Sequence, residues 1–376
     1  MTKPLLLLAL LAPTLASAAI ELPVKECAGR LEFSVPAQIE LPLAGDYNLT
    51  NGDYPKWDVA MFENYRVTYW ANMKYGDFEL FTTDPFKADK ALAIRQDYFD
   101  TNRKLHNYYY RNRTTPATMQ YGKLVKWFGE GKTKAFGESA PTVIEFIIYD
   151  KNFYYFYKSV KDNKEMNEES DRLPLVADYK QIAENFRRRE LNEIPTEVGA
   201  CMPYGFIRDD GQVPIHFQTT FRLNDHPEVE VSIFEESERG KKEAKITRDR
   251  EHSALVWNVD GFFEDHYYWT KSLSRGFIFN RYHSLTMNGK NALWSRGNYT
   301  APNGSKNITF VAAVLGDQNN PHIEVAVARY TGYAQGTPMS DEEVIDLGKR
   351  IAASVRVRPT SNAPTPPYPN FFEPVN

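Results

Sequence analysis

The segment IPTEVGACMPYGFIRDDGQVP, residues 194–214, opens the second half of the chain and organises the rest of it. Gly199 and Gly205 can adopt positive φ angles that are sterically costly for other residues. Pro195 and Pro203 fix φ and prevent a helix from continuing. The pattern predicts a polar approach, a turn, Cys201, a second turn and the start of an apolar strand. Such punctuation between two charged stretches is typical of the entrance to a domain.

A similar cysteine-led stretch, CAGRLEFSVP at residues 27–36, opens the first half of the chain. The two cysteines, Cys27 and Cys201, lie 174 positions apart. This spacing predicts two related domains, one after each cysteine, which we place at residues 20–190 and 194–358.

Both stretches resemble the Tli family of type VI secretion lipase immunity proteins, and more narrowly the branch cognate to class-four lipase effectors. The resemblance rests on C-x-GR-apolar-x-apolar-x-x-P at residues 27–36 and on IPTE-x-GAC-x-x-x-GFI at residues 194–207. It spans both halves, although most of the sequence between them carries no motif to match. Many members have Phe-Cys-Ile where this chain has Ala200-Cys201-Met202, so the match is looser there.

This resemblance implies a two-domain periplasmic protein that neutralises a cognate lipase or phospholipase toxin. In that family the two domains are pictured as a claw that grips the toxin near its active-site cover, so that lipid cannot enter. Such a steric inhibitor needs a rigid, complementary surface and neither catalytic residues nor a cofactor.

Residues 1–18 have the pattern of an export signal. Lys3 is the positive n-region, residues 5–11 are the apolar h-region, and Ala16-Ser17-Ala18 is an A-x-A cleavage site. The apolar run is too short to span a bilayer, and no later stretch approaches 18 consecutive apolar residues. We therefore expect a periplasmic mature chain that starts near Ala19.

The composition favours a globular protein over a nucleic-acid binder. Apolar residues make up 42% of the chain, which is enough for sizeable cores, and the formal net charge is −4. Cationic side chains are dispersed among acidic ones, so no long-range attraction to nucleic acid is expected. The run Arg187-Arg188-Arg189 is interpreted as the cationic end of a helix, where positive charge suits the helix dipole.

In the first half, the sequence predicts strands followed by a helix. The helix is expected at residues 178–191, with Asp178 as its N-cap and apolar residues at helical spacing. A second helix is expected at residues 85–103, and the triplet 150–152 is interpreted as a hairpin turn. The expected strands are residues 30–35, 66–71, 78–82, 142–149 and 153–160.

In the second half the same order recurs. Val229, Val231 and Ile233 alternate with polar residues, which predicts a half-buried strand. A helix is expected at residues 341–355, where Ser340 and Glu343 form a capping box. The further strands are residues 255–259, 275–282, 307–315 and 322–330, with a hairpin loop at 316–321. Because strands are grouped and helices come late, we expect an α+β fold of two related domains, each a mainly antiparallel sheet with a C-terminal amphipathic helix. The Pro-rich tail, residues 359–376, is expected to be extended.

The sequence contains no catalytic constellation with adequate spacing. G-x-S-x-G and H-E-x-x-H are absent, and a P-loop fails because Lys126 stands where its first glycine is required. Glu264, Asp265 and His266 are all possible metal ligands, but neighbours on a strand point to opposite faces. Their convergence on one ion is therefore not expected.

We interpret residues 264–269 instead as a partner-binding loop. Glu264, Asp265 and His266 lie beside Tyr267, Tyr268 and Trp269, and aromatic residues are enriched among interface hot spots. The same pattern also fits a strand end with its aromatic side chains in the core.

Cys27 and Cys201 are the only cysteines of a chain with an export signal, so a disulfide between the two domain entrances is expected. In the chain-entropy description, so long a loop adds roughly 4–5 kcal/mol of stability. Two buried, reduced thiols are the alternative.

Two classes of function are compatible with these features. The first is a binding protein that blocks a toxin sterically, as the resemblance implies. The second is an exported hydrolase or carbohydrate-binding protein with an aromatic-lined cleft, because 14% of the residues are aromatic. Aromatic richness suits both a protein interface and a sugar cleft, so it does not separate the two classes.

Overall fold

The fold is dominated by antiparallel β-structure. The computed structural model describes residues 21–41, 43–44, 60–62, 65–66, 73–76, 78–82, 126–128, 134–139, 143–149, 153–159, 182, 184–237, 282–300, 304–317 and 319–359. Within these residues every strand pair is antiparallel, and the one full α-helix is α5 (Asp341–Ser354). The structure is therefore α+β with mainly antiparallel sheets, as the sequence predicts.

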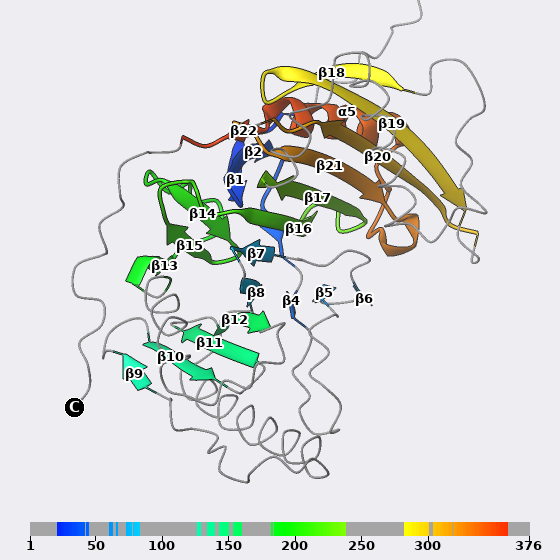
Figure 1. Ribbon diagram of the computed structural model, residues 1–376. Coiled ribbons are helices and arrows are strands. Elements are labelled where there is room, and N and C mark those ends of the chain that lie inside the picture. Colours follow the sequence, from blue (N-terminus) through cyan, green and yellow to red (C-terminus); the bar gives the residue numbers. More distant parts are fainter. Residues whose placement is uncertain are drawn as a thin grey trace, which may run out of the picture.

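One long sheet crosses the whole molecule (Figure 1). A short strand, β3 (Ile39–Glu40), lies outside the main strand order and pairs with β16 (Ile215–Leu223). From one edge to the other, the order is β18 (His283–Met287), β19 (Lys290–Thr300), β20 (Lys306–Val314), β21 (His322–Arg329), β17 (Val229–Glu236), β16 (Ile215–Leu223), β7 (Met73–Tyr75), β8 (Phe78–Thr82), β12 (Phe153–Ser159), β11 (Val143–Tyr149), β10 (Lys134–Ser139) and β9 (Lys126–Phe128).

Three small sheets accompany it, each of three strands. Apart from these sheets, a short 3₁₀ helix, η2 (Thr331–Tyr333), precedes α5 in the chain. The strands of the small sheets, in spatial order, are β1 (Val24–Ala28), β2 (Leu31–Val35) and β22 (Arg356–Val357); β13 (Phe186–Arg188), β15 (Gly205–Arg208) and β14 (Gly199–Met202); and β4 (Leu43–Ala44), β5 (Ala60–Phe62) and β6 (Tyr65–Arg66).

The long sheet joins strands from both halves of the sequence. Strand β7 pairs with β16, and Tyr75 lies opposite Ile215 in this register. In addition, β2 from the first half pairs with β22 near the end of the second. The long sheet thus joins the two sequence halves without interruption, and the division into domains 20–190 and 194–358 stays a prediction.

Many of the predicted strands occur where expected. Residues 78–82 form β8, and the expected hairpin of residues 142–160 appears as the pair β11–β12. The hairpin β20–β21 encloses a loop closed by an antiparallel bridge between Asp317 and Asn320. These segments are rich in β-branched and aromatic residues, which fit a pleated surface.

Helix α5 begins at the predicted capping box. The Ser340 side chain accepts from the backbone N–H of Glu343, and the Glu343 carboxylate accepts from the backbone N–H of Ser340. These reciprocal bonds satisfy two donors that would otherwise lack partners at the first turn. The helix buries Val344, Leu347 and Ile351 against the sheet.

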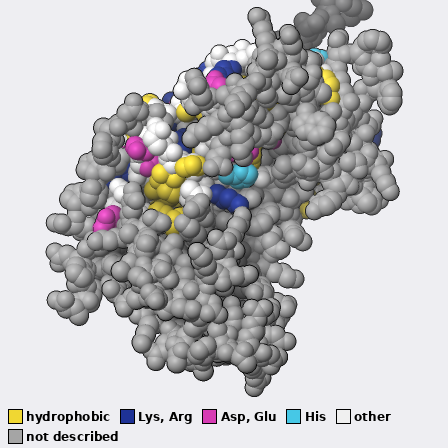
Figure 2. Space-filling model, viewed as in Figure 1, with side chains coloured by type: hydrophobic (Ala, Val, Ile, Leu, Met, Phe, Trp, Pro, Cys, Tyr) yellow, Lys and Arg dark blue, Asp and Glu magenta, His cyan; other side chains and the backbone are white. Residues whose placement is uncertain are grey.

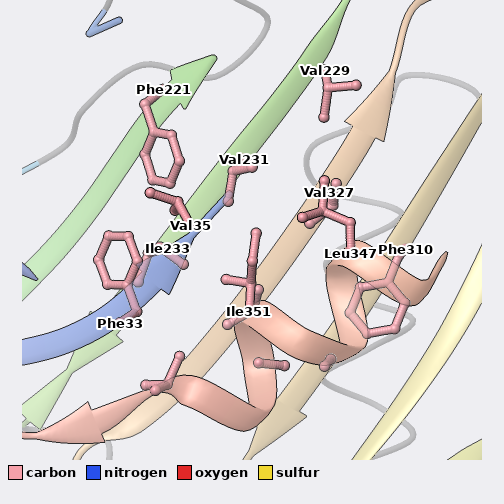
Figure 3. Packing of buried hydrophobic residues seen from close by; sticks show 14 of the residues in the cluster. Phe33, Val35, Phe221, Val229, Val231, Ile233, Phe310, Val327, Leu347 and Ile351 are labelled. Carbon is pink, nitrogen blue, oxygen red and sulfur yellow. The ribbon is translucent and has the colours of Figure 1, made fainter. Parts of the chain in front are cut away.

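The main core lies between α5, the β1–β2 hairpin and one face of the long sheet. Figure 3 shows Phe33 and Val35 of β2 pointing toward the sheet residues Phe221 and Ile233, beside Ile351 of the helix. A second cluster forms where β13, β14 and β15 cover β7, β8 and β16. Phe217 and Phe221 are four residues apart on β16 and project from the same face, so both layers cover one side of the sheet.

The predicted helix 178–191 is wrong in its second half. Ile182, Glu184 and Asn185 are helical, but residues 186–188 form strand β13 and pair with β15. Phe186 is fully buried there. The backbone hydrogen bonds and burial offered by β15 outweigh the local helical periodicity, which is a weak preference by comparison.

The predicted half-buried strand, β17, is buried on both faces. Glu228, Glu230 and Ser232, expected to face solvent, are at most 4% exposed. The carboxylate of Glu228 accepts from the backbone N–H of Met339, and the hydroxyl of Ser232 bonds that of Thr220. The polar alternation was real, but β17 occupies the middle of a wide sheet, where both faces are covered.

Several expectations lie outside the described residues. They are the export signal at 1–18, the helix 85–103, the turn 150–152, the strand 255–259, nearly all of the strand 275–282, the loop 264–269 and the tail beyond residue 359.

Candidate functional site

The segment 194–214 forms a hairpin of β14 and β15. Its turn passes through Pro203 and Tyr204, and Tyr204 has a φ of 55°. Gly199 begins β14 with a φ of 153°, and a Cβ there would lie 2.2 Å from the carbonyl oxygen of Ile207. Only glycine fits this close backbone approach, so the predicted special role of Gly199 has a physical basis.

A disulfide joins the hairpin to the first half of the chain. Cys27 on β1 and Cys201 on β14 are bonded, with their Cα atoms 5.8 Å apart. Both side chains are buried, at 2% and 0% exposure. Two backbone hydrogen bonds reinforce the link, because the N–H groups of Gly29 and Cys201 each donate to the carbonyl oxygen of the other residue. The disulfide expected between the two cysteine-led stretches is therefore present.

Next to the disulfide lies a buried ion pair between Glu26 and Arg189. Their side chains are 3% and 2% exposed, and the closest N–O distance is 2.7 Å. The Glu26 carboxylate also accepts from the backbone N–H groups of Cys27 and Asn192. Arg189 donates to the carbonyl oxygens of Cys27 and Met202. A buried charge needs such a full set of partners, because desolvation costs several kcal/mol per ion.

Arg358, at the end of the described chain, binds the other side of the hairpin. Its guanidinium donates to the carbonyl oxygens of Gly199, Pro195 and Glu197 and lies 3.3 Å from the sulfur of Cys201. It also lies over the ring of Phe206, at 5.3 Å from the ring centroid. Burial, and next the positive charge of Arg189, lowers the pKa of Arg358 from its ordinary value.

Arg30 ties the far end of segment 194–214 to the long sheet. Its guanidinium pairs with Asp209 at 2.6 Å, and Asp209 also accepts from the hydroxyl of Tyr75 at 2.9 Å. Burial, and next the Asp209 carboxylate, raises the pKa of Tyr75 well above its ordinary value. The backbone N–H of Arg30 donates to the Glu235 carboxylate at 2.7 Å. Burial raises the pKa of Glu235 to about 7, although the Arg30 charge opposes this shift.

We call this set the hub, comprising Glu26, Cys27, Arg30, Arg189, Cys201, Asp209 and Arg358. It holds together the start, the middle and the end of the described chain. The cavity beside it, lined in part by Glu26, Arg189 and Thr219, has room for about one water molecule. Within the described residues, no group of His, Cys, Asp and Glu side chains is arranged to hold a metal ion. The geometry of the hub is that of a structural centre.

A second group of polar side chains lies on the opposite face of the long sheet, where the two halves meet. His216 on β16 is in register with Lys74 on β7, and both are half-buried. Figure 2 shows a histidine and a basic side chain lying together over β7 and β16, next to apolar side chains. The His216 ring meets Phe234 edge to face at 5.0 Å.

Of the sequence-predicted site residues, the structure brings together Cys27 and Cys201. The proposed partner-binding residues Glu264, Asp265, His266, Tyr267, Tyr268 and Trp269 lie outside the described residues. The sequence reasoning missed the buried arginines. Arg30 is the arginine of the C-x-GR motif, whereas the prediction that Arg189 belongs to a helix end is wrong, because residues 186–188 form a strand and Arg189 is buried. Nothing in the local sequence distinguishes Arg358 as a buried residue.

Comparison with known families matches part of the second half of the chain. Residues 193–264 match the model of the Tle cognate immunity protein 4 C-terminal domain. The match begins at the hairpin described above and confirms the resemblance drawn from the sequence motifs. A comparison with curated protein sequences finds no match.

Comparison with solved structures finds the same fold in immunity proteins. The apo immunity protein TplEi of the type VI secretion system of Pseudomonas aeruginosa superposes with a TM-score of 0.53 and 17% identity. The crystal structure of the Tle4–Tli4 complex gives a TM-score of 0.51 and 17% identity, and TplEi complexed with "L" peptide gives 0.50 and 16%. Each match covers 90% of this chain and 98% of the other. At these identities the likeness concerns the fold.

Proposed function

We propose that this chain, whose residues 193–264 carry the Tle cognate immunity protein 4 C-terminal domain, is an immunity protein of type VI secretion. It binds a lipase effector in the periplasm and blocks it sterically, thereby protecting the producing cell. The observation that carries the proposal is the family match at the hairpin of residues 199–208, together with fold similarity over 90% of the chain to immunity proteins.

The proposed partner is supported by the sequence resemblance to lipase immunity proteins and by the likeness of the fold to the Tle4–Tli4 complex. Immunity proteins are generally non-catalytic, so a rigid surface is what such a protein requires. The hub suits this requirement, because the disulfide and the buried Arg30–Asp209 ion pair fix the two halves against each other. Rigid surfaces bind more tightly because less conformational entropy is lost on association.

Periplasmic localisation is supported by two independent features. The sequence of residues 1–18 has the pattern of an export signal. The buried disulfide suits an oxidising compartment, where such bonds form and persist. No helix in the described part of the chain is long and apolar enough to cross a bilayer.

The segment 264–269 remains our proposal for one contact with the effector, because Tyr267, Tyr268 and Trp269 lie there beside three polar residues. If it is a contact, truncating one of the three aromatic side chains weakens binding by at least ~2 kcal/mol while the protein still folds.

The test of the proposed function is capture followed by inhibition. The tagged protein is expressed in its own host, recovered from the periplasm and examined for a bound lipase. The captured lipase is then purified and its lipid release is followed with and without the protein. A lipase that binds and loses activity supports the proposal. A periplasmic eluate without lipase, or a lipase whose activity is unaffected, contradicts it.

A further inference from the structure

The loop between β21 and α5 presents an exposed aromatic side chain. Tyr333 is 44% exposed, and among the residues whose side-chain burial the structure describes it stands out as an exposed large hydrophobic residue. It lies in residues 331–338, which we call the tyrosine loop; Gly332, Gln335, Gly336 and Thr337 of this loop are also exposed. A single exposed apolar residue is common on protein surfaces, so its setting decides what it means.

The tyrosine loop is anchored at both ends by buried groups. Arg329, at the end of β21, donates to the carbonyl oxygen of Met339 at 2.6 Å and to that of Lys306 at 3.1 Å. The backbone N–H of Thr331 donates to the side chain of Asn307, and that of Met339 donates to the buried carboxylate of Glu228. The loop ends are therefore tied to the sheet.

Tyr333 itself is held within this frame. Its backbone N–H donates to the carbonyl oxygen of Tyr330 at 2.9 Å, and the two rings meet edge to face at 6.4 Å. A tyrosine that is positioned before binding loses little conformational freedom when a partner covers it, and its ring supplies a large apolar area with a polar tip. This combination is typical of interface hot spots.

The charges around the loop are mainly acidic. Asp225 and Glu342 are exposed, Asp341 is paired with Arg329, and Glu343 caps helix α5. Glu228 brings the two acidic segments together. Its carboxylate lies 3.2 Å from the ring of His226, the neighbour of Asp225, and accepts from the backbone N–H of Met339, which precedes α5. One exposed cation, Lys306, lies at the base of the loop. A partner that covers Tyr333 therefore meets an excess of negative charge.

We propose that the tyrosine loop is an effector-contact surface in which Tyr333 enters an apolar pocket on the lipase that is bordered by basic side chains. This inference rests on the proposed function and adds a contact site to it. Asp225 and Glu342 steer the encounter with the basic border, and Tyr333 holds the complex once it has formed.

The experiment uses the full-length protein and the lipase captured from the periplasm, with binding kinetics measured at two salt concentrations. We expect Tyr333→Ala to raise Kd at least 10-fold, mainly through faster dissociation, and Tyr333→Phe to retain most of the affinity. We expect Glu342→Lys and Asp225→Lys to slow association several-fold at low salt and to have less effect at high salt, because salt screens exposed charges. Glu190→Lys, an exposed acidic residue beyond β13, is the matched control and should leave association unchanged.

Melting curves of the variants check that they fold. We expect melting temperatures near that of the wild type, because the side chains of Tyr333 and Glu342 are exposed. Wild-type protein that binds and inhibits the lipase, together with a Tyr333→Ala variant whose Kd stays within twofold of wild type, overturns this inference and leaves the proposed function standing. Wild-type protein that does not bind the lipase overturns the proposed function itself.

Discussion

Single residues carry constraints that no neighbouring residue shares. Gly348 lies within α5, where glycine is normally unfavourable. A Cβ at this position would lie 2.3 Å from a ring carbon of Phe310, which is fully buried. The helix therefore approaches β20 closely because residue 348 has no side chain, and the packing at this position requires glycine.

Replacing Gly348 by Ala is expected to destabilise the protein. The added methyl group forces a buried aromatic ring to move, which costs about 1–3 kcal/mol, and this outweighs the gain of up to ~1 kcal/mol in helix propensity. Urea unfolding measures the difference. The control is Ala353→Gly at an exposed position of the same helix, which should lose only the propensity contribution. A Gly348→Ala variant as stable as wild type would show that the ring relaxes freely.

Glu235 gives the molecule a specific dependence on pH. Its carboxyl is fully buried, and its pKa is raised from 4.5 to about 7. Between these two values the folded state keeps a proton that the unfolded state has lost. The unfolding free energy therefore falls as pH rises from 4.5 to 7, by about 3 kcal/mol from this group.

The variant Glu235→Gln removes this titration while its side-chain oxygen still accepts from the backbone N–H of Arg30. We expect the stability of the variant relative to wild type to improve between pH 5 and pH 8 by up to about 3 kcal/mol. Denaturant titrations at both pH values measure it. The half-buried neighbour Glu236 supplies the control variant Glu236→Gln. A relative stability that does not change with pH would mean that Glu235 is already ionised at pH 5.

At the scale of elements, the β14–β15 hairpin is held from three directions. The disulfide links it to β1, Arg189 of the β13 side donates to Met202, and Arg358 after β22 donates to Gly199. The disulfide and the Arg358 contact each span more than 150 residues, whereas Arg189 lies 13 residues from Met202. The position of the hairpin thus depends in part on residues far away in the sequence, such as Cys27 and Arg358.

Breaking the disulfide is expected to destabilise the whole described fold. In the chain-entropy description the loop of 174 residues adds roughly 4–5 kcal/mol. Urea midpoints of the wild-type protein with and without dithiothreitol measure this loss, and thiol titration confirms that reduction is complete. The Cys27→Ala/Cys201→Ala variant is the control, because its midpoint should not respond to the reductant. An unchanged wild-type midpoint after full reduction would show that the disulfide does not contribute to stability.

At the scale of the whole molecule, one sheet carries strands from both halves, and the hub clamps the chain at their junction. A protein held together in this way suits an inhibitor that acts by covering part of its target. We expect inhibition of the cognate lipase to be stoichiometric, with protection saturating near one inhibitor per lipase, because a steric blocker does not turn over. A titration of lipid release against inhibitor concentration measures this ratio. Protection at far lower ratios would indicate a catalytic action on the toxin or the lipid.

The sequence alone determined the features that depend on local chemistry. The capping box of Ser340 and Glu343, the strands around residues 78–82 and 143–159, and the turn at Pro203 follow from short-range preferences that the tertiary structure leaves intact. The disulfide could also be anticipated, because only two cysteines are available in the chain. The motif residues at 27–30 and 194–207 pointed to the family without any knowledge of their contacts.

Only the tertiary structure decided which elements meet. It turned residues 186–188 into strand β13, because pairing with β15 outweighs helical periodicity, and it buried the polar residues of β17 because that strand lies mid-sheet. Arg189 and Arg358 became structural residues for the same reason, since their partners come from distant segments. The anchored, exposed setting of Tyr333 likewise depends on Arg329, Lys306 and Glu228 meeting in space. Local structural preferences depend on residues that are neighbours in the sequence. Burial and strand pairing depend instead on where the folded chain places each segment.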